Sequence, residues 1–390
     1  MLILLLYLLR WLSATAAAAS IAYCLIATFA GMRFVRRRRV PSSSTDLPRV
    51  SILKPLKGDD PGMYAALRSH CVQDYPQYEI LLGVTDAEDP AVPVVRRLMQ
   101  EFPAPTIRLV FTEKRMGANG KVSSLIQLAE AANGEYLLVN DSDIRVETDY
   151  LKTVMGELRQ PNVGMVTCLY RGLPGASVGS RLEALGINTD FVPGVLSADL
   201  LEGGLQFGLG STLAFRRSDL KAAGGFEAIV DYLADDYELG NRIAKLGRKI
   251  ELSRTIVETN LPMYDFAGFW AHQLRWARTI RASRPGGYTG LLLTYTLPWA
   301  LATLLFSEGT RWAWELTGVA FLARMILALQ TSRFVLGDKT WPSLLLFPVR
   351  DLVAVPVWFV GWLGSSIEWR GERFVLKDGK IIQRTNRLQP

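Results

Sequence analysis

Cysteine is scarce in this chain, with three residues in 390, and these lie far apart at Cys24, Cys71 and Cys168. Their spacing matches neither a zinc site nor a disulfide framework, so a disulfide-stabilised scaffold is excluded and a reducing compartment is favoured. A recognised nucleic-acid-binding module is also missing. The net charge of +7 is therefore better explained by contact with a membrane surface than by a nucleic-acid partner.

Charged residues are absent between Trp11 and Met32, a stretch long enough to cross a bilayer. Arginines follow at once, at Arg33 and at residues 36–39. A cleaved signal peptide is the alternative, because small residues are frequent here. However, its apolar region would be too long and its basic cluster would lie on the wrong side. Since Lys and Arg beside a span mark the cytoplasmic side, residues 1–40 predict a membrane anchor that leads into a cytoplasmic region.

Three further apolar segments lie near the C-terminus, at 286–307, 312–329 and 352–367. Buried core helices are the alternative for any one of them, but three in succession predict membrane segments over 286–367. The region 368–390 is rich in Lys and Arg, which predicts a basic tail on the cytoplasmic side.

The charge pattern also limits how many of these segments cross. A chain returns to its starting side only after an even number of crossings, so one of the three should not cross. The best candidate is 352–367, because a helix of that length rises about 24 Å, short of the roughly 30 Å hydrocarbon core. Arg350 and Asp351 at its start, and Pro356 inside it, also suit a re-entrant or interfacial helix.

Residues 41–48 are typical of a linker, and beyond them the pattern changes. Short apolar strands alternate with amphipathic helices over 49–262, which predicts an α/β domain with a doubly wound, mostly parallel sheet. Such sheets bind ligands in the crevice at the carboxyl ends of their strands. The side chains expected at those ends are Pro55, Asp86, Asp89, Asp141 and Asp143.

Asp141 and Asp143 occupy the stretch NDSDIR, directly after an apolar strand. Carboxylates two residues apart point to the same side of a strand and repel each other unless a cation lies between them. Mg²⁺ and Mn²⁺ take oxygen ligands of this kind and often share them with substrate phosphates. An Asp-rich turn that caps the next helix is the alternative. The position at a strand end favours the metal site.

Two stretches further along carry charge next to apolar residues. Asp235 and Asp236 stand at the head of a predicted helix, where the helix dipole alone also favours acids. Residues 263–285 place an arginine at every third position among aromatic side chains, which predicts an amphipathic helix on the membrane surface. Such a helix is also able to reach a diphosphate.

Two short stretches of the predicted α/β domain allow two interpretations each. Lys54 and Lys57, at the end of the first strand, either contact phosphate or are solvated. The glycine-rich segment 208–212 either approaches a substrate through its backbone or is a plain loop.

Six stretches occur in an order that is typical of one family: LKPLKG, ILLGVTDAEDPA, GANGKVSSL, DSDIRV, ADDY and HQLRWARTIR. Together they resemble the ceramide glucosyltransferases and their bacterial relatives, which are membrane-bound GT-A glycosyltransferases. The resemblance covers roughly 50–285, and WRGERFVLKDG near the C-terminus also fits. Several stretches are most similar to a bacterial subgroup associated with hopanoid biosynthesis, whose members are thought to transfer N-acetylglucosamine to phosphatidylethanolamine.

This resemblance implies a fold, a location and a reaction. The fold is a Rossmann-like GT-A domain in the cytoplasm, held by N-terminal and C-terminal transmembrane helices in a bacterial inner membrane. The reaction moves one sugar, with inversion, from UDP-glucose, UDP-galactose or UDP-N-acetylglucosamine to ceramide or phosphatidylethanolamine, with Mg²⁺ or Mn²⁺ as cofactor. A processive polysaccharide synthase shares this nucleotide site but usually has more spans. A non-enzymatic membrane receptor would not need acids at several strand ends.

The family's acidic residues fall on definite positions of this chain. By the resemblance, the first falls on Asp89, with Asp86 beside it, and contacts the nucleotide. The second falls on Asp141, and Asp143 stands where many relatives carry glycine, which completes an Asp-x-Asp metal site. The third falls on Asp236, the expected general base.

The family's closing motif is Gln or Arg, two further residues, and then Arg-Trp. Here these positions are His272, Arg275 and Trp276, a departure at the first position, although His272 still donates a hydrogen bond. Gln273 stands one residue too late to substitute. Arg275 and Lys121 are expected to place positive charge at the diphosphate, and Trp276 to offer a flat apolar surface to sugar or lipid. The expected nucleotide-binding set is Pro55, Asp86, Asp89 and Lys121, and the expected catalytic set is Asp236, His272, Arg275 and Trp276.

Overall fold

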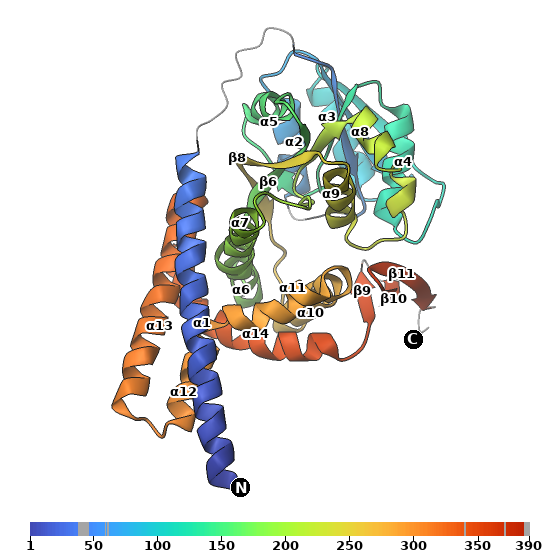
Figure 1. Cartoon of the computed structure of the whole chain (residues 1–390). Helices are drawn as coiled ribbons and strands as arrows, with labels where there is room; N and C mark the ends of the chain where they lie inside the picture. Colours follow the sequence, from blue (N-terminus) through green and yellow to red (C-terminus); the bar gives the residue numbers. More distant parts are fainter. Residues whose placement is uncertain (38–46, 59, 61, 339–340, 370–371, 386–390) are drawn as a thin grey trace.

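The computed structural model describes residues 1–390 apart from 38–46, 59, 61, 339–340, 370–371 and 386–390. Figure 1 shows a bundle of long helices, an α/β domain beside one end of this bundle, and a small sheet near the C-terminus. Most of the linker expected at 41–48 falls outside the described residues.

An eight-stranded sheet forms the centre of the α/β domain, in the order β3-β2-β1-β4-β7-β6-β8-β5. The first four strands in this order are mutually parallel, and β6 is parallel to β8. Strand β7 is antiparallel to β4 and β6, and β5 is antiparallel to β8. The predicted α/β class with a mostly parallel sheet is confirmed. The strands are β1 (Val50–Pro55), β2 (Tyr78–Val84), β3 (Thr106–Phe111), β4 (Tyr136–Val139), β5 (Ile144–Arg145), β6 (Val163–Leu173), β7 (Leu213–Arg216) and β8 (Lys249–Asn260).

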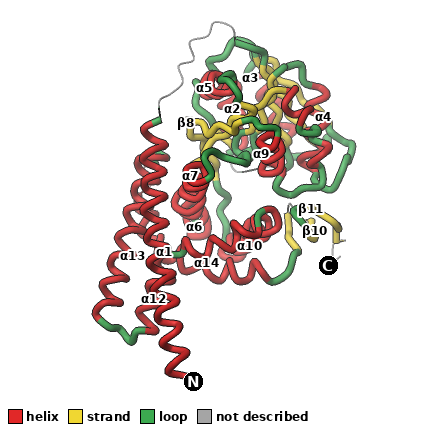
Figure 2. The backbone as a smooth tube through the Cα atoms, in the orientation of Figure 1, coloured by secondary structure: helices red, strands yellow, loops and turns green. Residues whose placement is uncertain are grey.

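Helices cover both faces of this sheet (Figure 2). Ile52 and Leu53 of β1 are both fully buried but belong to cores on opposite faces, because successive strand residues point to opposite sides. A strand covered on both faces is apolar throughout rather than alternating, which explains runs such as EILLGV in β2. The helices are α2 (Met63–Cys71), α3 (Ala91–Glu101), α4 (Gly120–Ala131), α5 (Tyr150–Leu158), α6 (Val178–Gly186), α7 (Val192–Leu201), α8 (Arg217–Ala222) and α9 (Asp235–Lys245), with the π-helix η1 (Ile187–Phe191) between α6 and α7.

The bundle consists of α1 (Leu2–Arg36), α12 (Thr296–Phe306) and α13 (Arg311–Gln330), which pack against one another (Figure 1). Among the described residues, three helical segments are by length and composition able to cross a membrane: Leu2–Arg36, Arg311–Val335 and Ser343–Trp362. The bent pair Pro285–Thr294 and Thr296–Phe306 makes a fourth if it forms one broken span. The end of α1 is tied to the α/β domain, because the Arg37 guanidinium pairs with the Asp199 carboxylate of α7.

The apolar segment expected as one stretch at 286–307 is broken in the structure. The helical pieces Pro285–Thr294 and Thr296–Phe306 meet at a bend of 57°. The first piece comprises α11 (Pro285–Gly290) and the 3₁₀ turn η3 (Leu291–Thr294). Pro298 explains the break, because proline lacks the N–H that a continuous helix needs and is tolerated only in a first turn.

Helix α14 (Phe347–Trp362) runs across the bundle instead of along it, and lies beside α10 (Phe266–Ser283) (Figure 1). It begins before the apolar run expected at 352–367 and also ends earlier. The last residues of that run turn into strand β9 (Ser366–Trp369).

The region expected as a basic tail, 368–390, carries structure that sequence analysis missed. Strands β9, β10 (Glu372–Lys377) and β11 (Lys380–Thr385) form an antiparallel sheet. Phe374 and Leu376 point inward along β10 while their neighbours are more exposed, the alternation of a strand with one buried face. They pack with Leu233 of the α/β domain, so this small sheet rests against that domain.

Candidate active site

A cavity of about 940 Å³ begins at the carboxyl ends of β1 and β4 and continues between α7, α10 and α14 to the helical bundle. Most of the predicted site residues line it. These are Pro55, Lys121, Asp141, Asp143, Asp236, His272, Arg275 and Trp276.

Lys121 lies between two of the acids. Its Nζ is 2.8 Å from Asp141 Oδ1 and 3.0 Å from Asp235 Oδ2. The side chain of Asn119 caps helix α4 and thereby fixes the first turn that carries Lys121. Burial alone would lower the pKa of Lys121, but the charges of Asp141 and Asp235 outweigh burial and raise it. Lys121 is therefore a fixed cation at the strand ends.

Asp236 occupies the first turn of α9 and is held by two backbone amides. Gly210 N–H donates to its Oδ2 at 2.7 Å, and Tyr237 N–H donates to its Oδ1 at 2.8 Å. Burial, reinforced by the charge of Asp235, raises the pKa of Asp236. A side chain on Gly210 would meet Asp141 Oδ2 at 2.8 Å and Asp236 Oδ2 at 3.3 Å. Thus the 208–212 segment does approach the site through its backbone.

Asp141 and Asp143 are the carboxylates expected to hold a metal ion. Among the residues that the structure describes, no group of three or more His, Cys, Asp or Glu side chains could hold a metal ion. Mg²⁺, however, is commonly bound by one or two carboxylates and completed by phosphate oxygens and water. Both acids line the cavity, Asp141 with 43% of its side chain exposed. Burial and the neighbouring Asp141 raise the pKa of Asp143, so the pair fits an ion shared with a diphosphate.

Lys54 follows neither of its two expected interpretations. It is fully buried, and its Nζ donates to the backbone carbonyl of Asp141 at 2.8 Å. Burial lowers the pKa of Lys54 to about 7. Lys54 therefore holds the backbone of the Asp-x-Asp segment from within the protein interior, whereas Lys57 lines the cavity.

Asp86 and Asp89 do not join the other predicted residues, because neither lines the cavity. Both oxygens of Asp89 accept from Gly58 N–H, at 2.9 and 3.2 Å, and its Oδ1 also accepts from Ala91 N–H at 2.9 Å. Asp86 accepts from Glu88 N–H at 3.0 Å. Both acids thus stabilise turns, a frequent use of aspartate after a strand.

Asp60 is an acid that sequence analysis overlooked, although it also follows a strand end. It lines the cavity and accepts a hydrogen bond from the Ser142 hydroxyl, between Asp141 and Asp143. The expectation that acids just after a strand line the ligand crevice applies to Asp60 as well.

The closing motif sits on α10, which Asp265 caps by accepting from Gly268 N–H at 2.7 Å. His272, Arg275 and Trp276 face the cavity. The arginines farther along α10 serve elsewhere. Arg278 donates to Leu363 O, and Arg281 donates to Trp362 O and Gly364 O, each at 2.8 Å. These two arginines cap the end of α14.

Glu183 of α6 is a second residue that the sequence did not reveal. It is 1% exposed, with Oε1 3.0 Å from His272 Nδ1 and Oε2 accepting from Gln273 Nε2 at 2.6 Å. Burial would raise the pKa of Glu183, but these contacts and the charge of Arg350 lower it. Glu183 is therefore an ionised carboxylate that orients the imidazole of His272.

Aromatic rings line the cavity next to this pair. The ring centroid of Trp276 lies 5.7 Å from that of His272 and 5.8 Å from that of Phe191. The ring of Tyr264 stacks on that of His272, with 5.4 Å between the ring centroids. Flat apolar faces beside hydrogen-bonding groups suit a sugar ring or a lipid chain.

Comparisons with known proteins agree with this arrangement. The model of glycosyl transferase family 21 matches residues 12–382. Ceramide glucosyltransferase 3 of Caenorhabditis elegans is 25% identical over 87% of this chain and 75% of its own length. Ceramide glucosyltransferase 1 of the same organism is 26% identical over 88% and 75%. The fold is similar to that of the mannosyltransferase PcManGT from Pyrobaculum calidifontis, solved with GDP-Man and Mn²⁺. Its TM-score is 0.53 at 22% identity, over 90% of this chain and 93% of that one.

Proposed function

Since the chain belongs to glycosyl transferase family 21, we propose that it is a membrane-bound, inverting hexosyltransferase that moves one sugar from a UDP-sugar to a membrane lipid. One observation carries this proposal: a single cavity joins the acids and Lys121 at the strand ends to helices of the apolar bundle. A donor bound at the first place and a lipid arriving from the second would meet within it.

The donor end suits a leaving diphosphate. Breaking the glycosidic bond leaves negative charge on UDP, and cations held in advance stabilise that charge. Lys121 and Arg275 line this part of the cavity. Asp141 and Asp143 would hold a Mg²⁺ or Mn²⁺ ion, which supplies further positive charge to the diphosphate when it is bound.

Asp236 suits the role of general base. The acceptor's hydroxyl or amine attacks the anomeric carbon from the face opposite UDP, and a carboxylate nearby takes its proton. The raised pKa of Asp236 makes it a better proton acceptor than an ordinary aspartate, and two backbone amides fix its direction. Displacement from the opposite face converts an α-linked donor into a β-glycoside.

The aromatic end suits the acceptor. Trp276 and Phe191 would flank the sugar or the lipid, and the apolar residues between α7, α10 and α14 would accommodate the lipid chains. The proposed enzyme is a multi-pass protein of the bacterial inner membrane with its catalytic domain in the cytoplasm. The resemblance of the motifs keeps two lipids in view, ceramide and phosphatidylethanolamine.

The test is an assay of the chain in detergent with each UDP-sugar and each of the two lipids, read by mass spectrometry of the lipids. We expect one donor and one lipid to give a product with a single sugar. A polymeric product would favour a processive synthase. If no donor is consumed with either lipid, the proposed reaction is wrong.

A further inference from the structure

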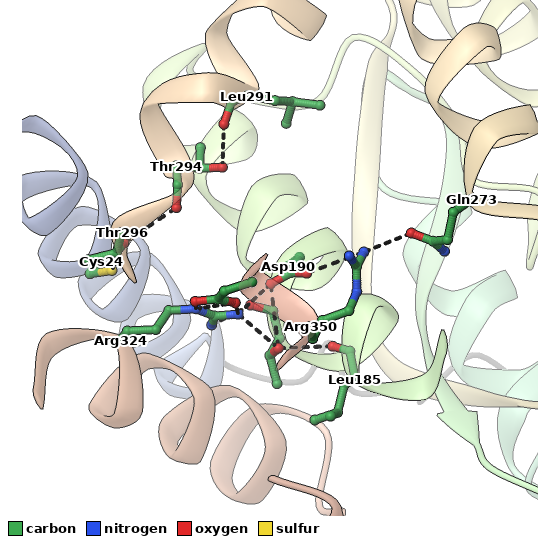
Figure 3. Close-up of polar contacts among 11 residues, drawn as sticks. Cys24, Leu185, Asp190, Gln273, Leu291, Thr294, Thr296, Arg324 and Arg350 are labelled. Atoms are coloured by element: carbon green, nitrogen blue, oxygen red, sulfur yellow. Dashed lines mark hydrogen bonds and ion pairs between the residues drawn. The ribbon is translucent and has the colours of Figure 1, made fainter. Parts of the chain in front are cut away.

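Four charged side chains meet where the cavity reaches the bundle, and Figure 3 labels three of them, Asp190, Arg324 and Arg350. Arg324 comes from the middle of α13, a segment otherwise apolar enough to span a membrane. Arg350 and Asp351 come from α14, and Asp190 comes from η1. Ionisable residues at such positions are costly and typically mark a substrate path or a functional site.

In two members of this cluster, Arg324 and Asp351, the hydrogen-bonding groups are already occupied. Arg324 is 3% exposed and donates to both oxygens of Asp351, at 2.8 and 2.9 Å. It also donates to Asp190 Oδ1 at 2.5 Å and to the backbone carbonyl of Thr189 at 3.0 Å. Arg324 and Asp351 therefore have little capacity left for a ligand.

The other two members, Arg350 and Asp190, have hydrogen-bonding capacity left for a ligand. Arg350 is 8% exposed, and its Nη2 donates to Gln273 Oε1 at 2.9 Å and lies 3.5 Å from Asp190 Oδ2. Its Nε and Nη1 are buried without a hydrogen-bond partner. Asp190 keeps 35% of its side chain exposed. Buried donors without an acceptor are destabilising, so Arg350 lacks an oxygen while Asp190 still offers one.

We propose that Asp190 and Arg350 bind the polar head group of the acceptor lipid, an inference that rests on the proposed function. Arg350 donates to an oxygen of the lipid, and Asp190 accepts from its hydroxyl or N–H group. The two arginines and two aspartates of the cluster sum to no net charge, so the head group that fits best carries no net charge either. An amide alcohol such as ceramide and a zwitterion such as phosphatidylethanolamine both have this chemistry.

A glycine of α6 fixes the place of Arg350. A Cβ built on Gly186 would lie 2.7 Å from both Nε and Nη2 of Arg350, closer than real contacts allow. Gly318 of α13 does not line the cavity, and a Cβ there meets nothing within 4 Å. Gly186→Ala and Gly318→Ala are therefore a matched pair of helical substitutions that moves Arg350 in one case only.

The experiment uses the full chain in detergent and compares wild type with Asp190→Asn, Gly186→Ala and Gly318→Ala. Binding of short-chain ceramide and of phosphatidylethanolamine is measured by native mass spectrometry, and KM is measured for lipid and for UDP-sugar. In the first two variants we expect lipid affinity to fall and lipid KM to rise on the order of 10-fold, since a hydrogen bond to a charged group is lost. The KM for UDP-sugar should stay unchanged, and Gly318→Ala should match wild type.

The lipid that loses affinity identifies the chemical groups that the site contacts. A loss confined to ceramide means that the site reads the amide and hydroxyl groups, and a loss confined to phosphatidylethanolamine means that it reads the phosphate and ammonium groups. If Asp190→Asn and Gly186→Ala keep wild-type lipid affinity while thermal unfolding shows them folded, or if Gly186→Ala and Gly318→Ala behave alike, the inference is wrong. If wild type binds lipid with this dependence but transfers no sugar, the proposed function fails and the inference survives.

Discussion

The two ends of the cavity hold clusters of buried charge that differ in balance. At the bundle, two arginines face two aspartates, and each charge has an opposite charge beside it. At the strand ends, carboxylates outnumber lysines. Burial raises the pKa values of three of these acids, Asp143, Asp235 and Asp236. A balanced cluster tolerates burial because each charge has its partner, whereas an unbalanced one is stabilised by a further cation. The unbalanced acids are Asp141, Asp143, Asp235 and Asp236, beside Lys54 and Lys121.

This difference separates two uses of buried charge. Acids whose pKa values are raised by burial and by neighbouring acids are suited to chemistry on a charged substrate. Paired groups among apolar helices are suited to holding elements together and to reading an uncharged or zwitterionic ligand. The changes below test this separation.

The largest effect is expected for Asp236→Asn. The amide is nearly isosteric but cannot take the acceptor's proton, so turnover should fall by about 10²–10⁴-fold. The affinity for UDP should change little, because the lost interaction belongs to the transition state. Steady-state kinetics and UDP binding by calorimetry measure the two quantities. Near-normal turnover would leave Asp236 with only a helix-capping role.

Asp141→Asn and Asp143→Asn should each lower turnover by about 10²-fold, because a metal's charge stabilisation amounts to several kcal/mol. Each variant should also need more Mg²⁺ or Mn²⁺ for half-maximal activity. Asp74→Asn is the matched control, since that exposed acid pairs with Lys152 far from the cavity. Full activity of the wild type in excess chelator would contradict the metal role.

Glu183→Gln should lower kcat about 10-fold by releasing His272, in line with the loss of a charge-assisted contact. Glu157→Gln is the matched control, because burial raises the pKa of Glu157 to about 7 and its carboxyl is already neutral below that pH. The closing motif that this chain resembles has Gln or Arg at the position of His272. In a His272→Gln background, the second change Glu183→Gln should therefore have a smaller effect than it has alone. Additive losses would mean that Glu183 does not act through His272.

Features encoded within a few neighbouring residues could be predicted from the sequence. The Asp-x-Asp pair follows its strand directly, and the strand–helix alternation fixes the sheet class. Glu183 and His272 could not be paired in advance, because a buried glutamate in α6 resembles any helical glutamate. The same holds for Arg324, whose partner Asp351 lies on another helix. Strands β9 to β11 were missed because the frequent Lys and Arg hid a weak apolar alternation.

The smallest effect concerns topology, where labelling should leave activity unchanged. The small C-terminal sheet contacts the α/β domain directly: Ile381 N–H donates to Asp231 O at 2.8 Å, and Leu233 N–H to Gly379 O at 3.2 Å. The C-terminal sheet and the catalytic domain must therefore lie on one side of the membrane, which requires an even number of crossings between them. Helix α13 would supply one crossing and the bent pair Pro285–Thr294 and Thr296–Phe306, taken as one broken span, would supply the second, if α14 lies along the surface beside α10.

Single cysteines test this layout, because Cys24, Cys71 and Cys168 are buried and should stay silent. Arg311→Cys, at the start of α13 where the arginine side chain is 94% exposed, should react with a membrane-impermeant thiol reagent in intact cells. Lys377→Cys, at the end of β10, should react only after the membrane is opened. Labelling of Lys377→Cys from outside would mean that α14 crosses. The charged cluster would then lie within a span, and the lipid would have to reach Asp190 and Arg350 from inside the bilayer instead of from its cytoplasmic surface.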